Sequence, residues 1–76
     1  MPPMSPEKLD PLIATLLVDI RDRLEHATTV AKGAVACAEG DDPQAGLQMA
    51  LDIEQPIYEV NTLLNAASLL NRCYRE

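Results

Sequence analysis

The single histidine of the chain, His26, is the first candidate for metal binding or acid–base chemistry. Asp22 precedes it by four residues and Asp19 by seven, so a helix places both carboxylates near the imidazole. An aspartate four residues earlier can orient the ring, and the pair can form half of a metal site. No second histidine, no Glu-x-x-His pair and no cysteine cluster completes this site. We therefore expect no metal, no cofactor and no catalytic residue, and we predict that His26 is a partly exposed surface side chain.

Arg23 is the second notable residue, because helical spacing places its charge inside an apolar line between Ile20 and Ala27. A charge there must reach outward to water or find a partner of opposite charge. In an antiparallel hairpin that turns at residues 40–42, position 23 lies opposite about position 59. We predict a salt bridge from Arg23 to Glu59 that sets the register of two helices, with Asp19 as a competing partner. The alternative is a recognition arginine at a partner surface.

The chain is acidic, with a net charge of −6 from twelve acidic and six basic residues. Between Gly33 and Asn71 there is no lysine or arginine, and six acids form a predicted acidic face: Glu39, Asp41, Asp42, Asp52, Glu54 and Glu59. Such a field repels phosphates and anionic lipids, so we expect neither direct nucleic-acid binding nor membrane binding. The simplest interpretation is a solvated face that favours solubility, and the alternative is binding to a basic protein surface.

The cysteines and the N-terminal segment bear on the compartment of the protein. Cys37 and Cys73 fit neither a disulfide framework nor a zinc site, and in a hairpin they lie ~40 Å apart, too far for a bridge. Residues 1–8 form a Pro-rich tail that we expect to be flexible and that lacks the pattern of a signal peptide. No apolar run approaches the ~20 residues of a membrane span. We therefore expect a cytoplasmic location.

Alanine and leucine are abundant and β-branched runs are few, which favours helices over strands. We expect one turn from Ser5 and then a main helix from about Asp10 to about Glu39, because Pro11 cannot donate a backbone hydrogen bond. The apolar line of this helix changes halfway from large to small residues: Leu9, Ile13, Leu16, Ile20, Leu24, Ala27, Ala31, Ala34 and Ala38. Small residues allow a neighbouring helix to approach closely. Gly33 costs the helix ~1 kcal/mol relative to alanine, and close packing is its predicted role.

A turn should follow, since Gly40 is suited to the position after a helix end and Asp42 followed by Pro43 is typical of a helix start. So short a turn between long helices forces them to run antiparallel. The second helix is predicted to run from Pro43 to about Tyr74. Pro56 lies inside it, so we expect a kink or a short break in the four residues before it. A complete break, which would give three helices, is the main alternative.

The predicted fold is therefore all-α, an antiparallel two-helix hairpin kinked near Pro56, with one domain over residues 9–76. Apolar residues lie on two nearly opposite sides of the second helix, Ile53, Ile57, Val60, Leu64 and Ala67 on one and Leu51, Tyr58, Ala66, Leu69 and Cys73 on the other. A helix with two apolar sides needs two neighbours, and the hairpin supplies one. We expect a homodimer that forms a four-helix bundle, with this interface: Leu12, Leu16, Leu17, Leu63, Leu64, Ala66, Ala67, Leu69 and Leu70.

The layout of a helix, the acidic turn of residues 40–44 (Gly-Asp-Asp-Pro-Gln) and an apolar second helix is similar to the small hairpin co-chaperones of type III secretion needle subunits. The resemblance covers the hairpin alone and assigns no functional residues. It implies a hairpin that masks an aggregation-prone helix of another protein.

Three functional hypotheses arise from these features. The leading one is a non-enzymatic interaction or regulatory protein that acts as a homodimer and presents a face to an unidentified protein partner. The second is a phage- or plasmid-encoded inhibitor or anti-activator whose acids block a basic, nucleic-acid-binding site on its target, with an affinity that falls steeply with salt. The third is the secretion co-chaperone, which would give its apolar face to a different chain.

Overall fold

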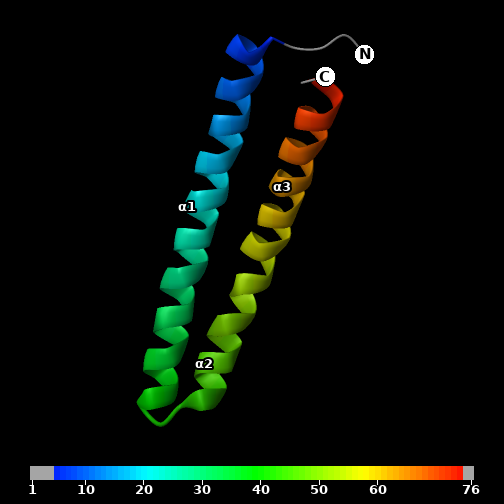
Figure 1. Cartoon of the computed structure of the whole chain (residues 1–76). Helices are drawn as coiled ribbons and strands as arrows, with labels where there is room; N and C mark the ends of the chain where they lie inside the picture. Colours follow the sequence, from blue (N-terminus) through cyan, green and yellow to red (C-terminus); the bar gives the residue numbers. More distant parts are fainter. Residues whose placement is uncertain (1–4, 75–76) are drawn as a thin grey trace.

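The computed structural model describes residues 5–74, which form a long helical hairpin (Figure 1). Helix α1 spans Pro6–Glu39 and forms the first arm. The returning arm contains α2 (Pro43–Ala50), the 3₁₀ turn η1 (Leu51–Ile53) and α3 (Glu54–Tyr74). The described residues contain no strand, and the hairpin measures 57 × 17 × 11 Å. The predicted all-α antiparallel hairpin is confirmed. None of the helices in residues 5–74 is long and apolar enough to cross a membrane.

Helix α1 begins earlier than predicted and is not interrupted near Pro11. The missing N–H of Pro11 removes only the hydrogen bond to the carbonyl of Glu7, which lies in the exposed first turn where water can take its place. Ser5 caps the helix with its backbone carbonyl, which accepts from the N–H groups of Lys8 and Leu9, and not with its side chain. Residues 6–8 of the predicted tail therefore belong to α1. Residues 1–4 of that tail, like the last two residues of the predicted domain, lie outside the described residues.

The turn between the arms places its left-handed residue one position later than the glycine in the sequence suggests. Asp41 has φ 69°, whereas Gly40 has φ −87°. The N–H of Asp42 donates to the carbonyl of Cys37 at 3.0 Å, and the N–H of Asp41 donates to that of Ala38 at 3.2 Å. This pair of bonds is a Schellman motif, with an aspartate where glycine is usual. The side chain of Asp42 then caps α2, as predicted, by accepting from the N–H of Ala45 at 3.0 Å.

The predicted break near Pro56 takes the form of η1, which separates α2 from α3. Pro56 is the third residue of α3, where the backbone N–H has no partner within the helix, so proline removes no hydrogen bond there. The two helices follow one another along the same side of α1 (Figure 1), so the returning arm is interrupted without being turned away. Pro56 itself is buried against the first arm.

Helices α1 and α2 are in close contact at Gly46. A Cβ atom at this position would lie 2.6 Å from the backbone carbonyl oxygen of Ala34. The small residues in the second half of α1 are therefore the surface on which α2 lies, as their spacing predicts. Gly33 lies under the side chain of Met49, whose Sδ would be 2.9 Å from an added Cβ atom.

The core of a single chain is thin. Four hydrophobic residues among those described are buried: Leu9, Ile20, Ala27 and Val60. Other members of the predicted line on α1 are only half-buried, namely Ile13, Leu16, Ala31 and Ala34, and two of them, Leu24 and Ala38, are exposed. A helix in a two-helix hairpin has one neighbour, which covers a narrow stripe of its surface.

Candidate functional site

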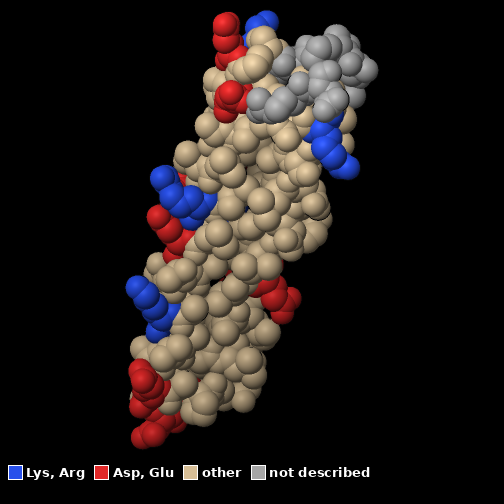
Figure 2. All heavy atoms as spheres, viewed as in Figure 1, with Lys and Arg blue, Asp and Glu red and all other residues tan. Residues whose placement is uncertain are grey.

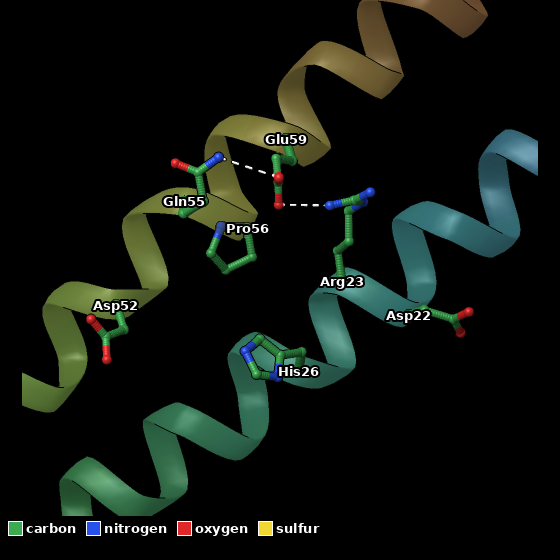
Figure 3. A pocket seen from close by; sticks show the side chains of 7 residues that line it. All are labelled: Asp22, Arg23, His26, Asp52, Gln55, Pro56 and Glu59. Atoms are coloured by element: carbon green, nitrogen blue, oxygen red, sulfur yellow. Dashed lines mark hydrogen bonds and ion pairs between the residues drawn. The ribbon is translucent and has the colours of Figure 1, made fainter.

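The polar groove is a shallow hollow of about 390 Å³ between α1 and the returning arm, and seven residues line it: Asp22, Arg23, His26, Asp52, Gln55, Pro56 and Glu59. Figure 3 shows the side chains of Arg23 and Glu59 pointing toward one another across the gap. Asp22 and Arg23 are neighbours on α1 and His26 lies one turn later, and the others come from η1 and the first turns of α3.

Arg23 forms the ion pair that its position in the apolar line predicts. Its Nη1 atom lies 2.6 Å from Oε1 of Glu59, and its Nε atom lies 2.9 Å from Oδ1 of Asp19. The predicted partner and the predicted competitor thus bind the same guanidinium group together. Gln55 donates to the other carboxylate oxygen of Glu59 at 3.2 Å. The hydrogen bond with Asp19 is the largest cause that raises the pKa of Arg23; desolvation opposes it, and the hydrogen bond with Glu59 adds to the rise.

These contacts bear on the two roles considered for Arg23. Because two carboxylates already occupy its guanidinium group, a ligand would have to displace one of them. Its side chain is 35 % exposed and that of Glu59 is 36 % exposed, so the pair closes one edge of the seam between α1 and α3. The arrangement favours a structural role, in which the pair holds the two arms in register, over a recognition arginine.

The other polar residues of the groove do not converge on one point. Asp22 points away from Arg23 and Glu59 (Figure 3) and accepts from Arg21 at 3.0 Å. His26 is exposed, in line with the prediction from the sequence. Within residues 5–74, no three or more histidine, cysteine or acidic side chains are grouped so that they could hold a metal ion. In chemical terms the groove is an ion-paired edge between two helices.

The opposite side of the hairpin carries what we call the apolar face: Leu17, Leu24 and Val35 from α1, with Ile57 and Leu64 from α3. All five side chains are between 41 and 56 % exposed. The spacing of seven residues from Leu17 to Leu24, and from Ile57 to Leu64, repeats after two helical turns. On α1 these residues lie about 100–120° around the helix from Arg23, and on α3 about 140–160° from Glu59. The ion pair and the apolar face are therefore on opposite sides of the seam.

Figure 2 shows this side of the molecule. In this view α1 runs down on the left and α3 runs up on the right. Because α-helices are right-handed, this arrangement places the apolar face toward the viewer. A broad band almost free of charged side chains follows the seam, and lysine, arginine and acidic side chains lie at its edges. The ion pair places Arg23 level with Glu59. With equal rise in both helices, Leu24 is then about level with Ile57, and Leu17 with Leu64. The apolar face thus presents two layers of large aliphatic side chains.

The structure divides the predicted interface residues among several surfaces. Leu17 and Leu64 belong to the apolar face, and four others are half-buried near the seam: Leu16, Leu63, Ala67 and Leu70. Leu12 and Ala66 lie on the side of the ion pair. Leu12 is eleven residues, or about three helical turns, before Arg23, and Ala66 is seven residues, or about two turns, after Glu59. Leu69 lies on the outer side of α3, 53 % exposed. The predicted set does not form one surface, since consecutive residues of a helix point in different directions.

The six acids of the predicted acidic face are divided as well. Acidic side chains gather at the turn end of the hairpin (Figure 2), where Glu39, Asp41 and Asp42 are exposed. Asp52 and Glu59 line the polar groove, and Glu59 is neutralised by Arg23. Glu54 lies at the start of α3, on neither the groove nor the turn. These acids form an acidic end and scattered charges along the returning arm.

Two features of the site were not identified from the sequence. Val35 was absent from every predicted surface, and Gly46 was not recognised as a close contact between α1 and α2. The signal for Gly46 was weak, because a glycine four residues into a helix is ordinary without knowledge of the neighbouring backbone. The seven-residue spacing of Leu17 with Leu24 and of Ile57 with Leu64 was visible, and it could have identified the apolar face.

Comparison of the chain with protein-family models, with curated proteins and with solved structures finds no match, so the residues themselves carry the functional interpretation.

Proposed function

We propose that this protein is a non-enzymatic, cytoplasmic interaction protein that acts as a homodimer, in which two hairpins pack into a four-helix bundle. The observation that carries the proposal is the poor burial of the single chain. Twelve large hydrophobic side chains in the described part of the chain are at least 37 % exposed, among them Leu17, Tyr58 and Leu69. Soluble monomers seldom expose so many large apolar groups, and a second chain is the simplest cover.

The surface area supports the same proposal. The chain exposes 5483 Å². A compact protein of this mass exposes roughly 4,600 Å², so the excess is about 900 Å². One partner of a standard protein–protein interface contributes about 800 Å². The surplus is therefore of the size that one specific interface removes.

The two alternative functions receive less support. An inhibitor of a basic site needs its acids on one surface, and the structure divides them between the turn and the returning arm. A co-chaperone would give the apolar residues of α3 to a foreign helix. In this hairpin Leu63, Ala67 and Leu70 are already half-buried near the seam with α1, which leaves them less available.

Sedimentation equilibrium tests the proposal, with circular dichroism at the same concentrations. We expect a species of twice the 8.3 kDa chain mass at tens of micromolar, and a loss of helix signal on dilution because the folded hairpin depends on its partner. High salt should leave this dimer intact, since apolar contacts are not screened. A compact, heat-resistant species of one chain mass at all concentrations would contradict the proposal.

A further inference from the structure

We infer that the second copy of this chain docks on the apolar face, Leu17, Leu24, Val35, Ile57 and Leu64, and not on the outer side of α3. The inference rests on the proposed function, because it takes the dimer as given and assigns its contact surface. It replaces the interface predicted from the sequence, of which Leu17 and Leu64 alone lie on this face.

The first argument is shape. Both arms contribute to the apolar face, and Leu24 lies about level with Ile57 while Leu17 lies about level with Leu64. Two such faces brought together give layers of four aliphatic side chains, one from each helix, which is the core pattern of a four-helix bundle. The outer side of the returning arm, with Leu51 from η1 and Tyr58 and Leu69 from α3, is one helix wide and cannot form such layers.

The second argument is charge. The band along the apolar face is almost free of charged side chains in Figure 2, so a partner chain can cover it with little burial of unpaired charge. The reverse side of the hairpin carries Arg23 with Asp19 and Glu59 in the middle of its length. Covering that cluster with another chain would remove three charged groups from water, at a large desolvation cost.

One consequence concerns the polar groove. If two hairpins meet through their apolar faces, the two grooves lie on the outer faces of the bundle, each with its Arg23–Glu59 pair still in contact with solvent. Native thiols report this arrangement, because Cys37 and Cys73 are half-buried and lie on the same side as the groove. Both thiols should therefore remain reactive toward a thiol reagent at concentrations at which the protein is a dimer.

Aspartate substitutions in matched pairs test the inference by sedimentation equilibrium. On α3 the pair is Leu64→Asp and Leu69→Asp, since these leucines are 47 and 53 % exposed and differ in the side they occupy. On α1 the pair is Leu24→Asp and Val18→Asp, at 41 and 47 % exposure. We expect Leu64→Asp and Leu24→Asp to raise the dimer Kd by at least about 100-fold, because each charge enters the interface twice. The controls should change the Kd by less than about 3-fold.

A gentler variant covers the case in which a charged variant fails to fold. In a chain with Cys37→Ser and Cys73→Ser, a single cysteine is placed at Leu64 or at Leu69, and its reaction rate with a thiol reagent is measured at high and low protein concentration. The cysteine at position 64 should be protected at least about 10-fold in the dimer, and that at position 69 should not be protected. If position 69 is the protected one, or if the Leu69→Asp and Val18→Asp controls dissociate the dimer, the inferred face is wrong while the homodimer stands. A monomeric wild-type protein would overturn the homodimer and the inferred face together.

Discussion

Replacing Gly46 with alanine tests how closely α1 and α2 approach. An ideal Cβ atom at this position lies 2.6 Å from the carbonyl oxygen of Ala34, well inside van der Waals contact. That oxygen belongs to the backbone of α1, five residues before the helix ends, so it cannot rotate away as a side chain would. Relief requires α2 to move away from α1, which loosens the apolar contacts around it.

The expected magnitude comes from two opposing effects. Alanine stabilises a helix interior by ~1 kcal/mol relative to glycine. Inserting a methyl group into a tightly packed contact costs about 1–3 kcal/mol, and a rigid neighbour favours the upper end of that range. The free energy of unfolding of Gly46→Ala should therefore fall by about 1–2 kcal/mol, which lowers the melting temperature of a small domain by about 5–15 °C.

Gly33→Ala is the matched control, because it adds the same methyl group to a helical glycine facing the other arm. Its neighbour is Sδ of Met49, at 2.9 Å, the flexible end of a side chain that can move aside. We expect Gly33→Ala to be neutral or to stabilise the protein by up to ~1 kcal/mol. Both variants are unfolded in urea and followed by circular dichroism at equal protein concentration, because stability depends on concentration in a dimer. If Gly46→Ala were as stable as Gly33→Ala, the close approach of the two helices would be refuted.

Three further predictions concern the turn and the ion pair. Asp41→Gly should raise the free energy of unfolding by about 0.5–1 kcal/mol in urea titrations, because glycine adopts the left-handed conformation of residue 41 without the cost borne by an L-residue. Asp42→Ala should lower it by about 1 kcal/mol, because α2 loses the side-chain cap on Ala45, and an unchanged urea midpoint would mean that the cap is not formed. Arg23→Gln should lower the melting temperature more than Glu59→Gln does. The first variant leaves two carboxylates facing each other, whereas the second leaves Arg23 bound to Asp19. The reverse order of melting temperatures in a calorimetric scan would contradict the shared pairing.

The raised pKa of Arg23 also sets the sign of its pH dependence. A cation whose pKa is higher in the folded state contributes its stability below the unfolded pKa and loses it only as the pH rises past the folded one. Arginine titrates far above neutrality, so the melting temperature should not change between neutral and mildly alkaline pH through this group. A fall in that range that disappears in Arg23→Gln would contradict this assignment.

Much of the hairpin could be predicted from local chemistry. The apolar period of the helices, the cap at Asp42 and the proline after it depend on neighbours within one turn of the chain, so they are visible in the sequence. The Arg23–Glu59 pair followed from the turn alone, because two helices of equal rise fix which residues lie opposite. The interruption before Pro56 followed from the missing N–H of that residue.

The predictions that the structure corrects depend on interactions with water or with distant parts of the chain, which the sequence does not show. Pro11 predicts that the main helix begins only near Asp10, but α1 begins at Pro6. One lost hydrogen bond in an exposed turn costs little free energy when water replaces it. The left-handed position fell on Asp41 and not on Gly40, because the point at which α1 stops depends on how the returning arm packs. The predicted dimer interface stays a prediction, and its residues lie on several sides of α3, because the sequence does not show in which direction α1 covers α3.

The sequence by itself determined that this chain is helical, antiparallel and too apolar for one hairpin to cover, because these properties depend on composition, period and turn chemistry. The tertiary structure alone decided which of these apolar side chains are covered and which remain exposed. The seam with α1 buries Val60, and it leaves Leu64 at the edge and Leu69 on the far side. The physical reason is the rotation of each helix about its own axis, which depends on contacts between residues distant in sequence, such as Gly46 against the backbone of Ala34 and Arg23 against Glu59.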